Sequence, residues 1–120
     1  MAKTLLVALL VGVALTAHAQ QQFPEGATTP NAAEIETYVK GKVFNVKVAN
    51  GTTWHMEYKG DGSLVVDPSS GRRYNGSWSF ADGKLCDQPR GQPKSCNDVR
   101  IYQDLLYLKR ESGEIIQFTP

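Results

Sequence analysis

The sequence has little of the side-chain chemistry from which catalytic and metal sites are built. Its 120 residues include only two cysteines and two histidines. Lys and Arg number 13 against 12 for Asp and Glu, so the chain lacks the broad positive charge that nucleic-acid binding needs. Its one long apolar run, near the N-terminus, is shorter than the roughly 20 residues that cross a bilayer. These absences argue against a nucleic-acid partner and against a membrane span in the mature chain.

The N-terminal segment is typical of a secretory signal peptide. Met1-Ala2-Lys3 supplies a positive start, residues 4–16 form an uncharged apolar run, and Ala17-His18-Ala19 matches the small-X-small pattern that signal peptidase reads. We therefore expect residues 1–19 to be removed by cleavage after Ala19, which makes the mature protein periplasmic or secreted. Residues 1–19 contain one of the 13 basic residues and no acidic one. After their removal 12 residues of each sign remain, so the mature chain is neutral.

The two cysteines, Cys86 and Cys96, fit an exported domain. An even cysteine count in an oxidising compartment predicts a disulfide, whereas the same pair in a cytosolic enzyme would suggest metal or redox chemistry. The loop that this bond closes is short, so chain entropy assigns it about 2.5–3 kcal/mol. With His55 as the only histidine of the mature chain, a zinc site would lack its usual three or four ligands. We expect neither a metal nor a cofactor.

The period of the apolar residues changes once along the mature chain. Residues 20–30 are polar, contain two prolines and are expected to form a flexible leader. Asn31 followed by Glu34 predicts a capping box that opens a helix over residues 32–40, with Gly41 as its stop. The apolar residues of this helix that share one face are Ile35, Tyr38 and Val39.

After the helix the apolar residues alternate with a period of two, which predicts β-strands. Asn50-Gly51, Asp61-Gly62 and Asp82-Gly83 are typical of tight turns between antiparallel strands. Residues 87–95 contain two prolines and a glycine, so they are expected to be a loop pinned by the disulfide. We therefore expect one mainly β domain over residues 31–120. It would be an antiparallel meander of about eight strands that forms a small calycin-like barrel or sandwich.

The inward faces of these strands are rich in aromatic rings. A barrel of about eight strands is just wide enough to be filled by side chains or to hold one small ligand. So many rings favour a packed core over a lipocalin-like cavity, and they direct any binding site to the outside. The predicted inward rings are Phe44, Trp54, Tyr58, Tyr74, Trp78 and Phe80.

No group of residues has the pattern of a catalytic site. His55 is expected to point outward beside Glu57, without partners for general base chemistry. The aspartates mostly precede Gly or Pro or lie in loops, where they bond their own backbone. The Ser69-Ser70-Gly71 run lacks the G-x-S-x-G pattern of a nucleophile elbow. We therefore expect a protein that is not an enzyme.

The order of short motifs resembles a family of small exported proteobacterial proteins of unknown function. In that family a helix precedes a meander with a G-x-W motif, then D-G-x-L-C, then a second Cys. The resemblance implies an exported protein with a calycin-like fold and a role in the cell envelope. Together with the export signal and the lack of a catalytic pattern, it predicts a non-enzymatic binding module for an envelope protein or a glycan. The matching residues are Asn31 to Ile35, Gly41 to Phe44, Asp61-Gly62, Gly76-Ser77-Trp78, Asp82 to Cys86, and Cys96.

A more local stretch is similar to the periplasmic inhibitors of animal-type lysozyme. Those inhibitors present an S-G-x-x-Y loop and a downstream Lys to the carboxylates of the enzyme, and here Ser70-Gly71-Arg72-Arg73-Tyr74 matches the loop and Lys84 the Lys. Around that Lys the inhibitors carry W-x-K-G, where this chain has Ala81-Asp82-Gly83-Lys84. The resemblance implies lysozyme inhibition as the alternative function. The candidate partner-binding residues are Ser70, Arg72, Arg73 and Lys84.

Overall fold

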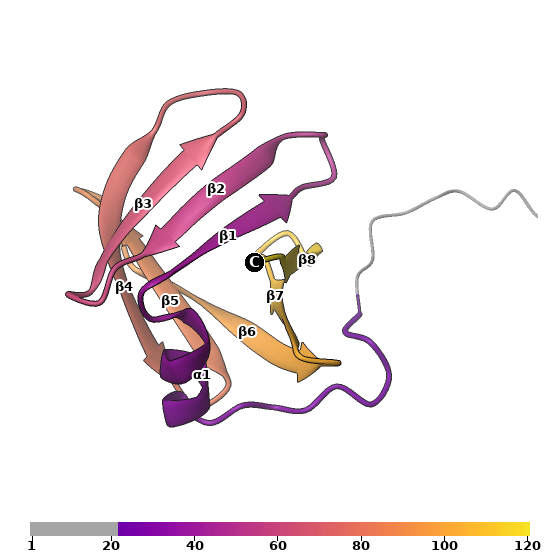
Figure 1. Cartoon of the computed structure of the whole chain (residues 1–120). Helices are drawn as coiled ribbons and strands as arrows, with labels where there is room; N and C mark the ends of the chain where they lie inside the picture. The colour runs from indigo at the N-terminus through magenta and orange to yellow at the C-terminus, as the bar shows by residue number, and fades with distance from the viewer. Residues whose placement is uncertain (1–21) are drawn as a thin grey trace, which may run out of the picture.

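The computed structural model describes residues 22–120, in which one helix is followed by eight strands (Figure 1). Every strand pairs antiparallel with the next, so the spatial order equals the chain order. The expected signal peptide, residues 1–19, lies outside the described residues. The elements are α1 (Ala32–Val39), β1 (Lys42–Lys47), β2 (Thr53–Tyr58), β3 (Ser63–Pro68), β4 (Tyr74–Ala81), β5 (Lys84–Pro89), β6 (Ser95–Tyr102), β7 (Leu105–Lys109) and β8 (Ile115–Phe118).

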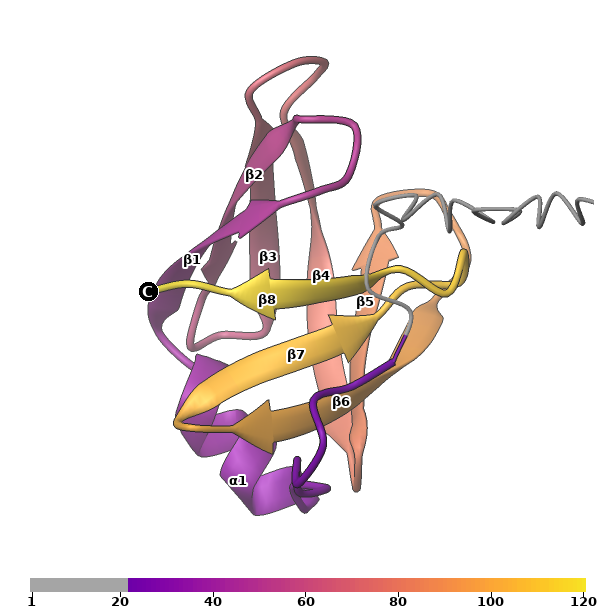
Figure 2. The same cartoon turned by 90° about the vertical axis from the view of Figure 1, so that its right-hand side faces the viewer.

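The sheet curls until its two edges meet, which makes a nearly closed barrel. Asn45 of β1 and Thr119, directly after β8, exchange two backbone hydrogen bonds with N···O distances of 2.7 and 3.0 Å. Figure 2 shows β8 lying between β7 and β1. The prediction of a mainly β meander of about eight strands is confirmed, in its barrel form.

Helix α1 covers one end of the barrel. It begins with the expected capping box, in which the Asn31 side chain accepts from the Glu34 N–H and Glu34 bonds back to Asn31. Its apolar face is fully buried at Ile35 and Val39. The Ala32 N–H also donates to the Asp82 carboxylate at 2.8 Å, in the turn between β4 and β5. The helix therefore closes the end of the barrel where the β4–β5 turn lies.

Residues 22–30, expected to be a flexible leader, lie against β6. Thr28 and Ile101 exchange two backbone hydrogen bonds of 2.9 Å. β6 runs past the start of β5 and would otherwise leave these backbone groups unpaired, which is costly in a folded chain. Arg100 also holds its guanidinium carbon 5.0 Å from the centre of the Phe23 ring. This part of the expected leader therefore belongs to the folded domain.

Two turns differ from their predicted form. Between β1 and β2 the Val48 N–H donates to the Thr52 carbonyl, and this bond encloses a turn of three residues, 49–51. Only Gly51 has a positive φ there (+89°), so it is not the expected two-residue Asn-Gly turn. The predicted loop at residues 87–95 is shorter, because β5 continues to Pro89. Pro89 ends that strand opposite Gly76, where its missing N–H is tolerated.

The disulfide between Cys86 and Cys96 is confirmed. The two residues lie directly opposite each other on β5 and β6, with a Cα–Cα distance of 4.0 Å. The bond therefore fixes the register of these two strands. That register also sets Asp87 opposite Ser95, both on the inward face of the barrel.

Candidate ligand-binding cup

The barrel is packed at the helix end and hollow at the other. Phe44, Tyr58, Trp78 and Phe118 are buried and lie ring against ring, with centroids about 5.3–6.0 Å apart. Beyond them a cavity of about 380 Å³, here called the cup, opens at the end opposite α1. It is lined by Trp54, Met56, Tyr58, Tyr74, Leu85, Asp87, Ser95, Asn97, Leu108, Arg110, Glu111, Ser112, Ile116 and Phe118.

The prediction of a filled barrel is therefore wrong for one end. Tyr74, expected in the core, is 38% exposed, and Trp54 is only partly buried. The reason is the polar residues on the inward faces of β5 and β6. Asp87, Ser95 and Asn97 occupy positions that a packed core would give to apolar side chains. The resulting volume falls within the roughly 300–1,000 Å³ of ordinary small-molecule sites.

Asp87 is the most unusual of these polar residues. In β5 it lies opposite Trp78 of β4 and Ser95 of β6, and its carboxylate is partly buried. Burial raises the pKa of Asp87 above its usual value, and the nearby negative charge of Glu111 adds to the rise. A hydrogen bond to the backbone lowers this pKa in part, but no neighbouring cation does, so the cup contains a carboxylate that no positive charge compensates.

Two tyrosines face this carboxylate from other strands. Burial raises the pKa of Tyr74 and the charge of Asp87 raises it further, while Arg110 lowers it. Burial also raises the pKa of Tyr58 far above its usual value, with smaller contributions from Asp87 and Tyr74. Both phenols therefore stay neutral at physiological pH, and they offer the cup hydroxyl groups and aromatic faces.

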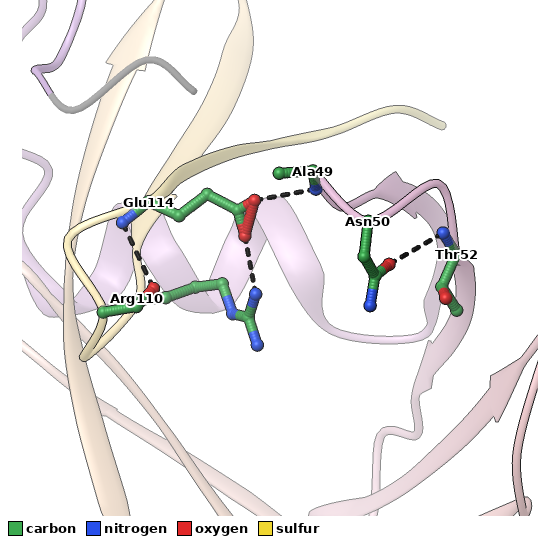
Figure 3. Close-up of polar contacts among 6 residues, drawn as sticks. Ala49, Asn50, Thr52, Arg110 and Glu114 are labelled. Carbon is green, nitrogen blue, oxygen red and sulfur yellow. Dashed lines mark hydrogen bonds and ion pairs between the residues drawn. The ribbon is translucent and has the colours of Figure 1, made fainter. Parts of the chain in front are cut away.

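The rim of the cup is fastened by Glu114. Its carboxylate accepts from the Ala49 N–H at 2.8 Å and from the Arg110 guanidinium at 2.6 Å, as Figure 3 shows. Burial alone would raise the pKa of Glu114, but the bonds from Arg110 and Ala49 lower it overall. Arg110 in turn lies over Trp54, with its guanidinium carbon 4.8 Å from the ring centroid. The β7–β8 turn is thereby tied to the β1–β2 turn.

A second contact ties the same turn to β6. The Ser95 hydroxyl donates to the Glu111 carboxylate at 3.1 Å. Glu111 is exposed at the rim, whereas Asp87 lies deeper on the inward face. The mouth of the cup is thus held on both sides by side chains of residues 110–114.

The structure does not bring together the residues expected to contact lysozyme. Ser70 lies in the β3–β4 turn at the open end, with its hydroxyl 3.0 Å from that of Thr52. Lys84 begins β5 at the helix end and forms an ion pair of 2.6 Å with Asp98. The strand β4 separates them, and eight residues at about 3.3 Å each amount to more than about 20 Å. No single small surface contains both residues.

Arg72 and Arg73 do meet another basic residue, on the outer wall. Arg73 and Arg90 line an outer hollow of about 490 Å³, and Arg72 and Arg90 line a neighbouring hollow of about 440 Å³. Both hollows flank the start of β4 and the β5–β6 turn. This set, Arg72, Arg73 and Arg90, is called the arginine wall below.

His55 lies outside the cup, exposed on β2, with its Nδ1 atom 3.0 Å from the Asn45 side-chain oxygen. Within residues 22–120, no three His, Cys, Asp or Glu side chains gather in a metal-binding arrangement. No helix in that same range has the length and apolar character to cross a bilayer.

Sequence reasoning missed the central residues of the cup, Asp87 and Arg110. The signal was present, because Asp87, Ser95 and Asn97 fall on the inward period of two strands joined by the disulfide. A polar run at buried positions is typical of a lined cavity. Because residues 87–95 are predicted to be a loop, Asp87 and Ser95 are not assigned to the inward faces of two strands.

The chain matches no known family model, no curated protein and no solved structure.

Proposed function

We propose that the protein is an exported, non-enzymatic binding module that takes a small ligand into the cup. The observation that carries this is the cavity of about 380 Å³ at the end of the barrel opposite α1, with Asp87 on its wall. It combines an apolar floor with a few converging polar groups, which is the usual composition of a ligand site. The disulfide and the N-terminal signal pattern support a location in the periplasm or outside the cell.

The experiment compares the protein with a variant whose cup is filled. Asn97→Phe adds a ring at a cup-lining position, and Arg73→Gln is the matched control on the outer wall. Each protein is incubated with a small-molecule extract of the cell envelope, and co-purifying compounds are identified by mass spectrometry. We expect a compound retained by the native chain and by Arg73→Gln but lost from Asn97→Phe. Equal retention by all three proteins, or none by any, contradicts the proposal.

The arginine wall supports a second candidate, binding of an anionic envelope glycan on the outside. Three guanidinium groups around adjoining hollows suit sulfate, phosphate or carboxylate groups of a polymer. The test is the salt concentration that elutes the protein from an anionic polysaccharide column. The triple change of Arg72, Arg73 and Arg90 to Gln should elute much earlier. A control variant, in which three exposed lysines are changed to Gln, should elute at a higher salt concentration than the arginine triple variant. Elution of both triple variants at the same salt concentration would contradict this candidate. The control lysines are Lys42, Lys47 and Lys109.

Lysozyme inhibition has less support. It requires Ser70 and Lys84 to act on one enzyme cleft, and the two residues lie at opposite ends of β4. An unchanged lysis rate with micromolar protein is the expected outcome of a lysozyme assay.

A further inference from the structure

We propose that the ligand of the cup is a small organic cation with an apolar body, held by its positive group at Asp87 beside Tyr74. The inference rests on the proposed function and adds the chemical class of the ligand. It follows from the charges that line the cup, from the aromatic faces beside Asp87, and from the position of the apolar floor.

The charge of the cup favours a cation. Three charged residues line it: Asp87, Glu111 and Arg110. Arg110 is already paired with Glu114 at 2.6 Å, and that pair is itself fixed to the Ala49 N–H. Asp87 and Glu111 are therefore the two carboxylates that no lining cation neutralises. An anionic ligand would meet both of them, whereas a cation would compensate the partly buried Asp87.

The walls next to Asp87 are also suited to a cation. The rings of Trp54, Tyr58 and Tyr74 line the same cavity, and the face of an aromatic ring attracts positive charge. The protein itself uses this attraction there, because Arg110 lies 4.8 Å from the Trp54 ring centroid. Arg110 occupies one face of Trp54, and Tyr74 is the most exposed of these three rings, at 38%.

The floor of the cup indicates the chemistry of the part of the ligand that lies away from its positive group. Below Asp87 the lining is mostly apolar, with its apolar residues on four strands and Asn97, opposite Leu85, as a polar residue among them. Burying an apolar group there is favourable by about 25 cal/mol per Å² of surface removed from water. A ligand with a positive group and a hydrocarbon or aromatic body therefore matches both the wall at Asp87 and the floor of the cup. The floor residues are Met56, Leu85, Leu108, Ile116 and Phe118.

The test uses three probes that share a phenyl body and differ in charge: phenethylammonium, 2-phenylethanol and phenylacetate. Affinities for the disulfide-bonded protein are measured by calorimetry. We expect phenethylammonium to bind at least about tenfold more tightly than 2-phenylethanol, which corresponds to about 1.4 kcal/mol. Phenylacetate should bind most weakly of the three.

Two variants assign the charge preference to a residue. Asp87→Asn should remove the preference for phenethylammonium and leave the affinity for 2-phenylethanol unchanged. Asp67→Asn, an exposed acid on β3, is the matched control and should behave as the native chain. Asp87→Asn relieves a burial cost, so it is not expected to unfold, and near-UV circular dichroism checks this.

The outcomes separate this inference from the proposed function. If 2-phenylethanol or phenylacetate binds as tightly as the cation, or if Asp87→Asn keeps the preference, the cation inference is overturned while the cup remains a binding site. If none of the three probes binds, the cation inference is overturned and the proposed function loses its support as well.

Discussion

Arg110 lies with its guanidinium carbon 4.8 Å from the centre of the Trp54 ring, although 56 positions separate the two residues in the chain. This contact spans from the end of β7 to β2 across the mouth of the barrel. It covers one face of Trp54 and holds Arg110 in reach of Glu114. The cup is therefore built from long-range contacts at its rim as well as from the strands that form its wall.

Glu114 should contribute strongly to stability. Glu114→Ala removes the acceptor of the Ala49 N–H and the partner of Arg110, and we expect a loss of about 1–3 kcal/mol in the free energy of unfolding. Urea denaturation at pH 7 measures it. The control is Glu36→Ala, which breaks an exposed ion pair of the same i,i+4 spacing and should cost less than about 1 kcal/mol.

The contribution of Glu114 should depend on pH. Its pKa is lowered in the folded chain, so the stabilisation is present above the ordinary value of 4.5 and is lost as the pH falls through the folded value. The difference between native and Glu114→Ala proteins should therefore shrink at pH 3. An equal difference at pH 3 and pH 7 would contradict this account of the rim.

Asp87 should have the opposite effect on stability. Its pKa is raised in the folded chain, so ionisation disfavours folding, and this cost appears as the pH rises from the ordinary value of 3.8 through the folded value. Asp87→Asn should therefore raise the melting temperature by roughly a few degrees at pH 7. At pH 3 the two proteins should melt together. A melting temperature of Asp87→Asn below that of the native protein at pH 7 would contradict the claim that no cation compensates the charge of Asp87.

Gly76 should not tolerate a side chain. A Cβ atom there would lie 2.3 Å from the Gln88 carbonyl oxygen and 2.9 Å from the Pro89 Cα atom, both of which are backbone atoms of β5. Gly76→Ala is expected to cost about 1–3 kcal/mol, or to displace the end of β5. Gly60→Ala is the control, because its Cβ would meet only the flexible end of Lys40 at 3.8 Å. Equal unfolding midpoints for the two variants would contradict the close approach.

The disulfide should support both stability and the cup. Replacing Cys86 and Cys96 by Ser is expected to lower the free energy of unfolding by about 2.5–3 kcal/mol. Since the bond fixes the register that sets Asp87 opposite Ser95, the affinity for a cup ligand should fall as well. If the variant without the disulfide binds a cup ligand as tightly as the native protein, the strand register does not need the bond.

Much of the fold could be predicted because its signals are local. The capping box of Asn31 and Glu34 fixes the helix start through bonds three residues apart. The alternation of Phe44, Val46 and Val48 identifies a strand with one buried face. The cysteine pair needed only an even count in an exported chain.

The cup could not be predicted in the same way. Whether rings fill a barrel depends on how its strands tilt and where the sheet closes, and the closing bonds join Asn45 to Thr119. The role of Glu114 depends on Ala49, 65 positions away. Lys84 and Ser70 match a motif in sequence but lie at opposite ends of β4. Local patterns specify elements, whereas a site depends on which ends of those elements meet.

The most direct test of the cup uses the two tryptophan side chains as probes. Trp54 lines the cup, whereas the Trp78 indole N–H donates to the Lys59 carbonyl at 2.8 Å. Their indole N–H resonances are followed by NMR while phenethylammonium is added. We predict a saturable shift of the Trp54 resonance with the Trp78 resonance unchanged. A silent Trp54 resonance, or saturable shifts confined to the outer wall around Asn75 and Arg90, would contradict a ligand site inside the barrel.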